Sequence, residues 1–357
     1  MKNSIVGRVT DGFFRYQAWP TVTKDGSGVL YAVSSGHRLG HVCPFGKNYL
    51  YISRDDGNSW DGPIVANDTY MDDRDAGLCA WGDGNLLLSW FSLTKEFFDG
   101  REERTPLLTT PLALAARELW KTLPEGQYDP GAFIRLSDDG GKTWGNKIRV
   151  QVTAPHGPIY RKDGSLLFFG KVYLWEDSEA YPDGQICAVE SRDGGHTWQK
   201  LGDVPEPDGV DRTQLHEPYA VELTDGTLLG AIRVHAPEGI TIYLTRSTDG
   251  GNSWETPAPT GICGAPPHLL LHTSGAVVMV YGRRKKPCGQ RAKVSYDGGK
   301  TWSEEITVGP ESQDWDCGYP SSVELSDGSI LTVYYQKYPG DTYNSILSTR
   351  WELPKED

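Results

Sequence analysis

Apolar and polar residues alternate along most of this chain in short runs separated by turn sequences. In six places one alternating run meets a Gly-containing dipeptide and a second run follows it. Such a dipeptide between two alternating runs is a strong signal for a β-hairpin. The sequence therefore predicts six hairpins, whose turns are Asp25-Gly26, Asp83-Gly84, Asp163-Gly164, Asp225-Gly226, Ser274-Gly275 and Asp327-Gly328.

A second pattern, Ser-x-Asp-x-Gly-x-(Thr/Ser)-Trp, lies between the hairpins and is called the Asp box below. It occurs five times, at residues 53–60, 137–144, 191–198, 247–254 and 295–302. Its Asp and Gly favour a tight turn through side-chain hydrogen bonds and positive φ, and its Trp is expected to fill the gap between neighbouring sheets. Repeats at this spacing indicate supersecondary units that stack or close into a ring.

The sequence has six hairpins but only five Asp boxes. This predicts a ring of six four-stranded blades, the last of which has no Asp box. The Asp-Gly turn would join the first two strands of each blade, and the Asp box the last two. The last blade then lacks a fourth strand after residues 344–352, so residues 4–9 are expected to supply it and close the ring. We thus predict an all-β fold, a single six-bladed β-propeller over residues 1–357.

The longest gap between boxes predicts an insertion in blade two, at about residues 93–130. Within it, Thr110 precedes Pro111 and an Ala/Leu-rich stretch that runs to Lys121. A Thr at the cap and a Pro in the first turn are typical of a helix start, so a short helix is expected there.

Charge and composition narrow the classes of partner. The formal net charge is −13, which argues against nucleic acid and anionic membranes. No apolar run has the length of a membrane-spanning helix, and no signal peptide is visible, which leaves a cytoplasmic protein or a secreted or periplasmic domain without its leader. The six scattered cysteines have no zinc spacing and are expected to be reduced, and no cofactor or metal motif is present.

Chain direction predicts which polar residues share the face opposite the Asp boxes, where the central funnel of a propeller opens. An acidic protein would there gather several arginines, which suit carboxylate, sulfate or phosphate. These residues are Arg15, His37, Arg38, His41, Asp73, Arg74, Asp75, His156, Glu217, Arg233, His235, His268, Arg283, Arg284, Arg291 and Tyr319.

Four stretches of the chain resemble the sialidase (neuraminidase) superfamily. Residues 217–233 begin with Glu217 and end with Arg233, residues 281–299 contain Arg291, residues 318–328 contain Tyr319, and residues 14–20 contain Arg15. The resemblance implies a propeller with Asp boxes, three arginines that bind the substrate carboxylate, and a Tyr nucleophile activated by a Glu. It assigns Tyr319 as nucleophile, Glu217 as its base, and Arg15, Arg233 and Arg291 as the clamp, with Arg283 or Arg284 in place of Arg291 as the alternative.

The chemistry gives a reason for these residue types. The anomeric carbon of a sialic acid carries its own carboxylate, which would repel a carboxylate nucleophile. A neutral phenol avoids that repulsion but needs a partner base, because its unperturbed pKa is about 10. Tyr319 with Glu217 would supply this pair. Arg38, Arg74 and Asp75 are expected to bind ring substituents or the leaving group.

The chain departs from the family pattern at the general acid. The family places an Asp in the first blade, but residues 36–48 contain neither Asp nor Glu. His41 lies nearest to the vacant position, His156 faces the same funnel, and Asp73 and Asp75 flank Arg74 in the next blade. Each is a candidate for the acid, since each can carry a proton to the leaving group.

The preferred hypothesis is a retaining exo-glycosidase that releases a terminal carboxylate-bearing sugar, such as a sialic acid or a related nonulosonic acid, from a sialylated or other acidic glycan. The missing Asp keeps two alternatives open. One is a uronate-specific polysaccharide lyase, which also neutralises a carboxylate with Arg and uses Tyr or His as base and acid. The other is a glycan-binding propeller without catalysis.

Overall fold

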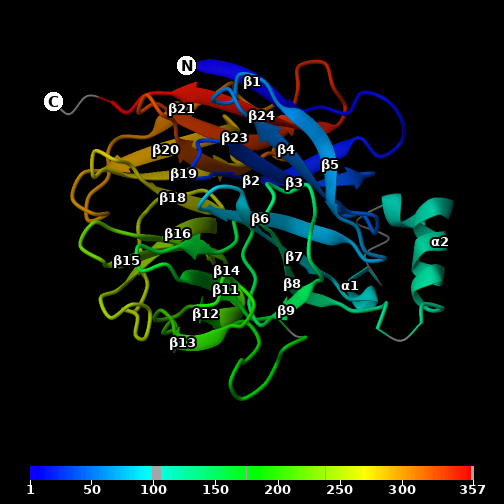
Figure 1. The fold of residues 1–357 in the computed structure, drawn as a ribbon, viewed down its shortest axis with the longest axis horizontal. Coiled ribbons are helices and arrows are strands. Elements are labelled where there is room, and N and C mark those ends of the chain that lie inside the picture. Colours follow the sequence, from blue (N-terminus) through cyan, green and yellow to red (C-terminus); the bar gives the residue numbers. More distant parts are fainter. Residues whose placement is uncertain (99–105, 125, 174, 238, 355–357) are drawn as a thin grey trace.

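The computed structural model describes residues 1–98, 106–124, 126–173, 175–237 and 239–354. Over these residues, the strands form six four-stranded antiparallel sheets, which follow one another round a ring in chain order (Figure 1). Blade one consists of β2 (Tyr16–Lys24), β3 (Leu30–Arg38), β4 (Lys47–Ser53) and β5 (Asp61–Asn67). Blade two consists of β6 (Asp73–Trp81), β7 (Asn85–Ser92), β8 (Gly131–Ser137) and β9 (Ile148–Val150). The six-bladed all-β propeller is therefore confirmed.

The remaining blades repeat this plan. Blade three consists of β10 (Ile159–Tyr160), β11 (Leu166–Lys171), β12 (Ile186–Ser191) and β13 (Gln199–Asp203), and blade four of β14 (Leu215–Glu222), β15 (Leu228–Ala236), β16 (Gly239–Ser247) and β17 (Ala258–Pro259). Blade five consists of β18 (Pro267–Leu271), β19 (Val277–Arg283), β20 (Gly289–Ser295) and β21 (Ile306–Val308). All six predicted turns join the first two strands of a blade, and all five Asp boxes join the last two.

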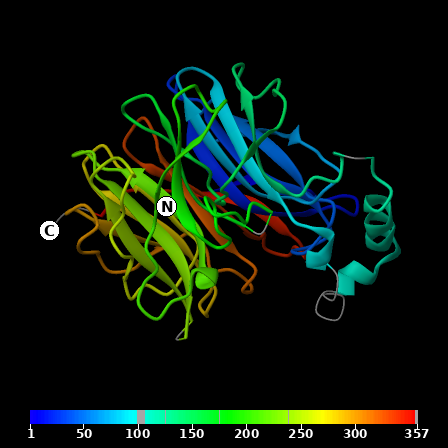
Figure 2. The same cartoon turned by 90° about the horizontal axis from the view of Figure 1, so that it is seen from below.

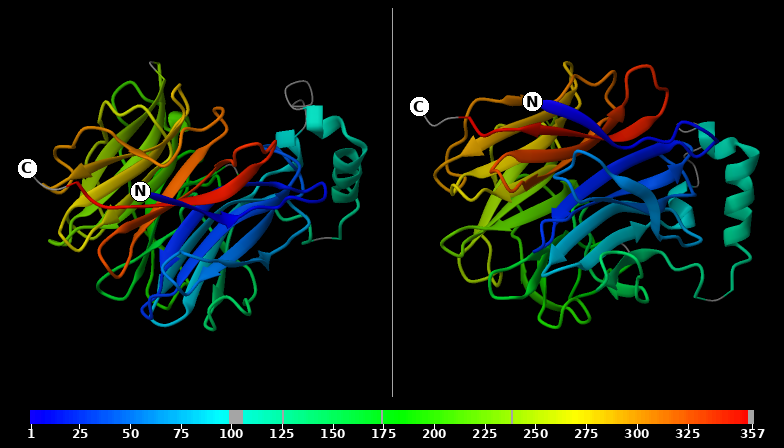
Figure 3. Two further views of the ribbon diagram at one scale, coloured as in Figure 1. Left: turned by 90° about the horizontal axis from the view of Figure 1, so that it is seen from above. Right: turned by 45° about the horizontal axis from the view of Figure 1, so that its top comes forward.

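The ring closes through the N-terminal strand, as predicted. Blade six contains β22 (Gly318–Glu324), β23 (Ile330–Lys337) and β24 (Asn344–Trp351), and its fourth strand is β1 (Lys2–Gly7). β1 pairs antiparallel with β24, with Ser4 opposite Ser348; Figure 3 shows the two strands side by side. The outer edge of β24 is thereby covered, which removes an exposed pairing surface.

Hydrogen bonds within the Asp box explain why this phrase makes a turn. In the fourth box, the Ser247 hydroxyl donates to Asp249 at 2.8 Å and accepts from the Gly251 N–H at 2.8 Å. Asp249 also accepts from the N–H and the hydroxyl of Ser253 at 2.9 and 2.6 Å. Gly251 has φ +100°, a conformation that a side chain disfavours. Polar side chains thus satisfy the turn's backbone locally.

Six apolar clusters fill the spaces between successive blades. Each Asp-box Trp packs into the cluster between its own blade and the preceding one, as predicted, and Trp254 shows it most clearly. Its ring lies 4.5 Å from that of Phe169 in blade three. Blade six has no Asp box, and Trp351 of β24 takes the corresponding place against blade five.

The insertion in blade two contains the helix predicted at residues 110–121. Helix α2 (Pro111–Trp120) begins after Thr110, whose side chain accepts a hydrogen bond from Ala113 N–H. Trp120 donates to the carbonyl of Tyr70 at 2.6 Å, so α2 packs on the outside of blade one, at the edge of the ring in every view (Figures 1, 2 and 3). The other helices are α1 (Lys95–Phe98) and the 3-10 helices η1 (Pro106–Thr109) and η2 (Arg212–Gln214); residues 99–105 of the predicted insertion lie outside the described residues.

No helix within the described ranges combines the length and the apolar composition that crossing a bilayer requires. All six cysteines are free, and five of them are buried.

Candidate active site

Four inner strands carry a bulge at the same place, and each bulge holds a non-glycine residue in the left-handed region. The residues are Trp19 in β2, Asp75 in β6, Glu217 in β14 and Tyr319 in β22, with φ of +53°, +49°, +46° and +48°. The strand register shifts at each of them. This conformation is costly without glycine and concentrates at functional sites. The four positions are therefore candidates for a shared site.

Tyr319 and Glu217 meet directly across the ring, because the Tyr319 hydroxyl donates a hydrogen bond to Glu217 Oε1. Arg233 Nη1 donates to the other oxygen, Glu217 Oε2, at 2.7 Å. The sequence predicted these three residues together, and the structure brings them together. A phenol that donates a hydrogen bond to an ionised carboxylate has the arrangement of a candidate nucleophile with an adjacent base.

The charges of this pair follow from burial and neighbours. Burial alone would raise the pKa of Glu217, but Arg233 and the hydrogen bond from Tyr319 outweigh it and hold that pKa at about 2. Burial, followed by the negative charges of Glu217 and Asp75, raises the pKa of Tyr319 well above its usual value. Near neutral pH, Glu217 is therefore ionised and Tyr319 is protonated.

Arg284 is the second arginine at this pair. Its guanidinium lies 5.6 Å from the centre of the Tyr319 ring, and it donates to Cys317 O at 3.1 Å and to the Tyr335 hydroxyl at 3.0 Å. Within the described residues it has no carboxylate partner. Its positive charge therefore remains available to an anion bound beside Tyr319.

Arg291 and Arg15 occupy other places than the sequence predicted. Arg291 is buried on β20, where it pairs with Glu305 at 3.2 Å and donates to the carbonyls of Gln290 and Pro287 at 2.8 and 2.9 Å. These three partners use its guanidinium, and Arg284 takes its expected place. Arg15 donates to Thr10 O at 3.2 Å and stacks over Tyr343 at 4.5 Å, on the blade-six side of the N-terminal segment.

Two more predicted arginines gather round Trp19. The guanidinium groups of Arg38 and Arg74 lie 4.7 and 4.3 Å from its ring centre. Both pair with the buried Asp72, Arg38 through both of its terminal nitrogens and Arg74 at 3.3 Å. Arg38 is fully buried, whereas Arg74 remains slightly exposed. Arg38 thus supports the wall of the site, and Arg74 is the third cation near its centre.

Asp75 is the least satisfied acidic group of the site. Its side chain is buried, and its Oδ1 has no hydrogen-bond partner among the described residues. Burial raises its pKa to about 7, against the opposing charge of Arg74 and with help from Glu217. Asp73 also has a pKa raised to about 7 by burial, but it accepts hydrogen bonds from Thr69 and Ser92 and so has a structural role.

His41 forms a dyad with Asp316, and the sequence analysis named only His41. Its Nδ1 lies 2.9 Å from Asp316 Oδ1, and Asp316 also accepts from the hydroxyls of Tyr16 at 3.0 Å and Tyr335 at 3.1 Å. Burial lowers the pKa of His41 despite Asp316, and that of Asp316 is lowered chiefly by His41 against the effect of burial. Sequence reasoning missed Asp316, although it lies only two residues before the start of β22.

His156 is buried near the pair and makes no hydrogen bond to either member of it. Its ring centre is 6.5 Å from that of Tyr319 and 5.0 Å from that of His268, and its Nδ1 is 3.1 Å from Thr21 Oγ1. Burial lowers its pKa to about 3, so the ring is neutral. Elsewhere, the described residues contain no group of three His, Cys, Asp or Glu side chains placed to hold a metal ion.

Comparison with known proteins gives a consistent picture. The family of BNR repeat-like domains matches residues 134–341, which is more than half of the chain. A sialidase from Bacteroides fragilis (strain YCH46) is 26% identical over 246 residues, which cover 62% of this chain and 42% of that protein. The chain thus spans less than half the length of this curated relative.

Solved structures share the fold at low sequence identity. A protein of unknown function from Dyadobacter fermentans has a TM-score of 0.78 at 20% identity and covers 99% of this chain and 98% of its own. The NanB sialidase from Streptococcus pneumoniae has a TM-score of 0.70 at 13% identity, covering 98% and 70%. An α-L-arabinanase from Penicillium chrysogenum has a TM-score of 0.63 at 13% identity, covering 99% and 98%.

The Asp boxes, the closed ring and the family match agree on one assignment. The chain belongs to the family of BNR repeat-like domains, and its fold is a sialidase-like six-bladed propeller.

Proposed function

We propose that this protein is a retaining exo-glycosidase that releases a terminal α-linked sugar acid, such as a sialic acid or a related nonulosonic acid, from a glycan. The observation that carries the proposal is the hydrogen bond from Tyr319 to an ionised Glu217, with Arg233 and Arg284 on either side. The naming of a relative as a sialidase supports a glycoside hydrolase. An arabinanase has the same fold, so the fold alone does not determine which sugar is bound.

Arg233 and Arg284 are the proposed clamp for the substrate carboxylate, with Arg74 as the third positive charge. Guanidinium groups bind carboxylates through paired hydrogen bonds, and Arg284 has no competing carboxylate among the described residues. A carboxylate held here would place the anomeric carbon above the Tyr319 hydroxyl.

Tyr319 would then attack the anomeric carbon while Glu217 takes the phenol proton. The phenol is neutral, so the substrate carboxylate does not repel it, and the two arginines stabilise negative charge as the phenolate develops. The step forms a glycosyl–tyrosine bond, a known exception to the scheme of two carboxylates. Water would later release the sugar with its anomeric configuration retained.

Asp75 is the proposed acid, chosen among the open candidates. With a pKa of about 7 it keeps a proton near neutral pH, and its Oδ1 has no protein partner. His41 fits less well, because an ionised Asp316 can accept a hydrogen bond but cannot donate one, so the proton of a neutral His41 lies on Nδ1. The bare Nε2 of His41 is then a base. Burial holds the pKa of His156 at about 3, so it is neutral near pH 7 and lacks the imidazolium proton that a general acid donates.

The test uses sialosides and other nonulosonic-acid glycosides with the wild-type protein, Tyr319→Phe and Glu217→Gln. Wild-type protein should release the sugar first as the α-anomer, which proton NMR detects. Tyr319→Phe should lose turnover by at least ~100-fold, since the covalent step needs the phenol oxygen. Wild-type kinetics in the phenylalanine variant, or first release of the β-anomer, would sink the proposal. Binding of the glycosides without any turnover would instead identify a glycan-binding propeller.

A uronate lyase is the second candidate, and the His41–Asp316 dyad is the observation that favours it. A neutral histidine with a bare Nε2 is suited to remove the proton next to a carboxylate that arginines neutralise. Such a reaction leaves an unsaturated uronate, which absorbs in the ultraviolet. Absorbance that grows with uronate oligosaccharides and disappears in His41→Ala would decide for the lyase.

A further inference from the structure

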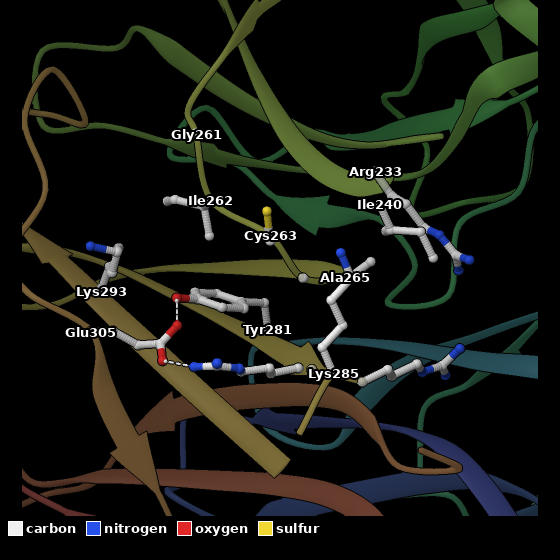
Figure 4. Close-up of a pocket in the computed structure, with 14 residues that line it drawn as sticks. Arg233, Ile240, Gly261, Ile262, Cys263, Ala265, Tyr281, Lys285, Lys293 and Glu305 are labelled. Atoms are coloured by element: carbon white, nitrogen blue, oxygen red, sulfur yellow. Dashed lines mark hydrogen bonds and ion pairs between the residues drawn. The ribbon is translucent and has the colours of Figure 1, made fainter. Parts of the chain in front are cut away.

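A pocket of about 450 Å³ opens between blades four and five, next to the proposed clamp. Arg233 and Arg284 form its inner end, and its walls continue through Cys263 and Tyr281 to Glu305. Figure 4 shows Arg233 and Ile240 at one end of the pocket and Lys293 with Glu305 at the other. Its volume lies within the range of small-molecule sites.

The walls of this pocket are strongly positive in a protein whose net charge is −13. Its described lining contains five cationic side chains and one carboxylate, namely Arg233, Arg283, Arg284, Lys285, Lys293 and Glu305. Glu305 is already shared between Tyr281 at 2.8 Å and Arg283 at 2.9 Å. Arg233 is paired with Glu217, which does not line the pocket. Arg284, Lys285 and Lys293 have no carboxylate partner among the described residues, and their positive charge favours an anion.

Lys285 is the cation best placed to meet a ligand. It follows directly after Arg284 in the chain and is exposed, and Figure 4 shows its side chain extending into the pocket toward Cys263 and Ile240. No ion pair to Lys285 exists among the described residues. The same pocket offers apolar surface from Ile240, Ile262 and the ring of Tyr281, against which the C–H face of a sugar can pack.

We propose that this pocket is a second anion subsite, which receives a leaving-group sugar that itself carries a carboxylate or a sulfate. The inference rests on the proposed function. In a glycoside of a 2-keto sugar acid, the anomeric carbon bears both the carboxylate and the glycosidic oxygen. A carboxylate held by Arg233 and Arg284 therefore brings the leaving group to the pocket that begins at these two residues. The enzyme would then prefer glycans whose last two sugars are both anionic.

The experiment compares kcat/KM for two substrates with the same terminal sugar: a disaccharide of two linked sialic acids, and sialyllactose, whose leaving group is neutral. A sulfated sialyllactose separates sulfate from carboxylate as the second anion. Wild-type protein should prefer the anionic leaving groups. Lys285→Gln should reduce this preference by about three- to fivefold, in the upper range for one exposed ion pair, and Lys285→Glu should reduce it further. Added salt should weaken the preference.

Lys286→Gln is the matched control, because it removes the same charge from the next residue, which does not line the pocket. Equal loss in Lys286→Gln and Lys285→Gln, or a wild-type enzyme indifferent to the leaving-group charge, would overturn the subsite. If wild-type protein cleaves none of these substrates, the proposed hydrolysis fails, and calorimetric binding of the disaccharide to wild-type protein and Lys285→Gln decides the subsite separately. An affinity for the disaccharide that is the same in Lys285→Gln and in the wild-type protein would also overturn the subsite.

Discussion

Asp75 and Asp73 show how two neighbouring carboxyl groups with the same pKa have different roles. Both have a pKa raised to about 7 by burial. Both oxygens of Asp73 accept hydrogen bonds, from Thr69 and Ser92. Asp75 has one oxygen without a partner among the described residues, and its charge interacts with those of Glu217 and Tyr319. Free hydrogen-bonding capacity, rather than the pKa, separates a candidate acid from a structural carboxyl group.

The first prediction concerns the pH dependence of turnover. As the pH rises through about 7, Asp75 loses the proton that it would donate, so kcat/KM should fall on the alkaline side. Asp75→Asn should lower kcat by at least ~100-fold on substrates with a poor leaving group, the usual contribution of a general acid, and should flatten this alkaline limb. The fall in kcat of Asp75→Asn should be much smaller on substrates with an activated phenolic leaving group. The measurement is a set of pH–rate profiles.

Asp73→Asn is the control for this prediction, since it removes a carboxyl group with the same pKa and leaves Asp75 in place. Its alkaline limb should match that of the wild-type protein. An unchanged limb in Asp75→Asn would assign the acid to another group.

The second prediction separates Arg284 from Arg291. Arg284→Gln should raise KM for the sugar acid, because one charged hydrogen-bonding partner of the carboxylate is lost at a cost of ~2 kcal/mol. Its free energy of unfolding should fall less than that of Arg291→Gln, because Arg284 has no ion pair within the described residues. Arg291→Gln should lower the free energy of unfolding more and leave KM nearly unchanged, since its partners Glu305, Gln290 and Pro287 belong to the protein and include an ion pair. Steady-state kinetics and urea unfolding of both variants provide the comparison. An equal rise in KM in both would contradict the placement of Arg291.

Sequence reasoning placed most residues on regular strands well, with Arg291 on β20 as the exception, and residues on loops less well. Glu217, Arg233 and Tyr319 lie on β14, β15 and β22, so strand direction and spacing sufficed to bring them together. Arg284 and Asp316 lie just outside strands, where the path of the loop decides which side chain reaches the centre. The choice between Arg284 and Arg291 depended on the pairing of β20 with β21 near Glu305, which no local pattern encodes.

At the scale of elements, the Asp box joins turn formation to blade packing. Its polar residues close the turn, and its Trp fills the cluster shared with the preceding blade. The repeated phrase therefore encodes both a hairpin and its neighbour, which is why the number and order of the blades could be predicted from the sequence. The bulges of the inner strands could not, because Trp19, Asp75, Glu217 and Tyr319 share no residue type and carry no glycine.

The third prediction tests the Trp of the fourth box. Trp254 is buried and stacks near Phe169 of blade three. Trp254→Ala should lower the free energy of unfolding by ~3–5 kcal/mol, as large-to-small changes in a core do. Trp315→Ala, at a Trp that is 57% exposed, should cost less than ~0.5 kcal/mol. Urea unfolding measures both, and similar costs would show that the Asp-box Trp does not hold the blades together.

For the molecule as a whole, stability depends on the closure of the ring by β1. Residues at opposite ends of the chain share blade six, and Val6 of β1 is buried in the cluster between blades six and one. Tyr319 lies in the same blade and the same cluster. Closure of the ring therefore bears both on stability and on the position of the candidate nucleophile.

The fourth prediction follows from this closure. Val6→Asp should lower stability by more than the ~1.5–3 kcal/mol that burying such a side chain provides, because it also buries a charge. Turnover should fall with it. Ile5→Asp changes the neighbouring side chain, which is 40% exposed, and should leave both nearly unchanged. Thermal unfolding and activity assays check this, and equal melting temperatures for the two variants would show that β1 does not lock the ring.

The four bulges have a consequence for how such a propeller acquires a new reaction. In four of the six blades, the inner strand holds one non-glycine residue at a kinked backbone position that the rest of the sheet keeps in place. A substitution at one of these positions can then change the chemistry of the site while the fold stays the same. Proteins built this way would diverge in reaction type long before they diverge in shape.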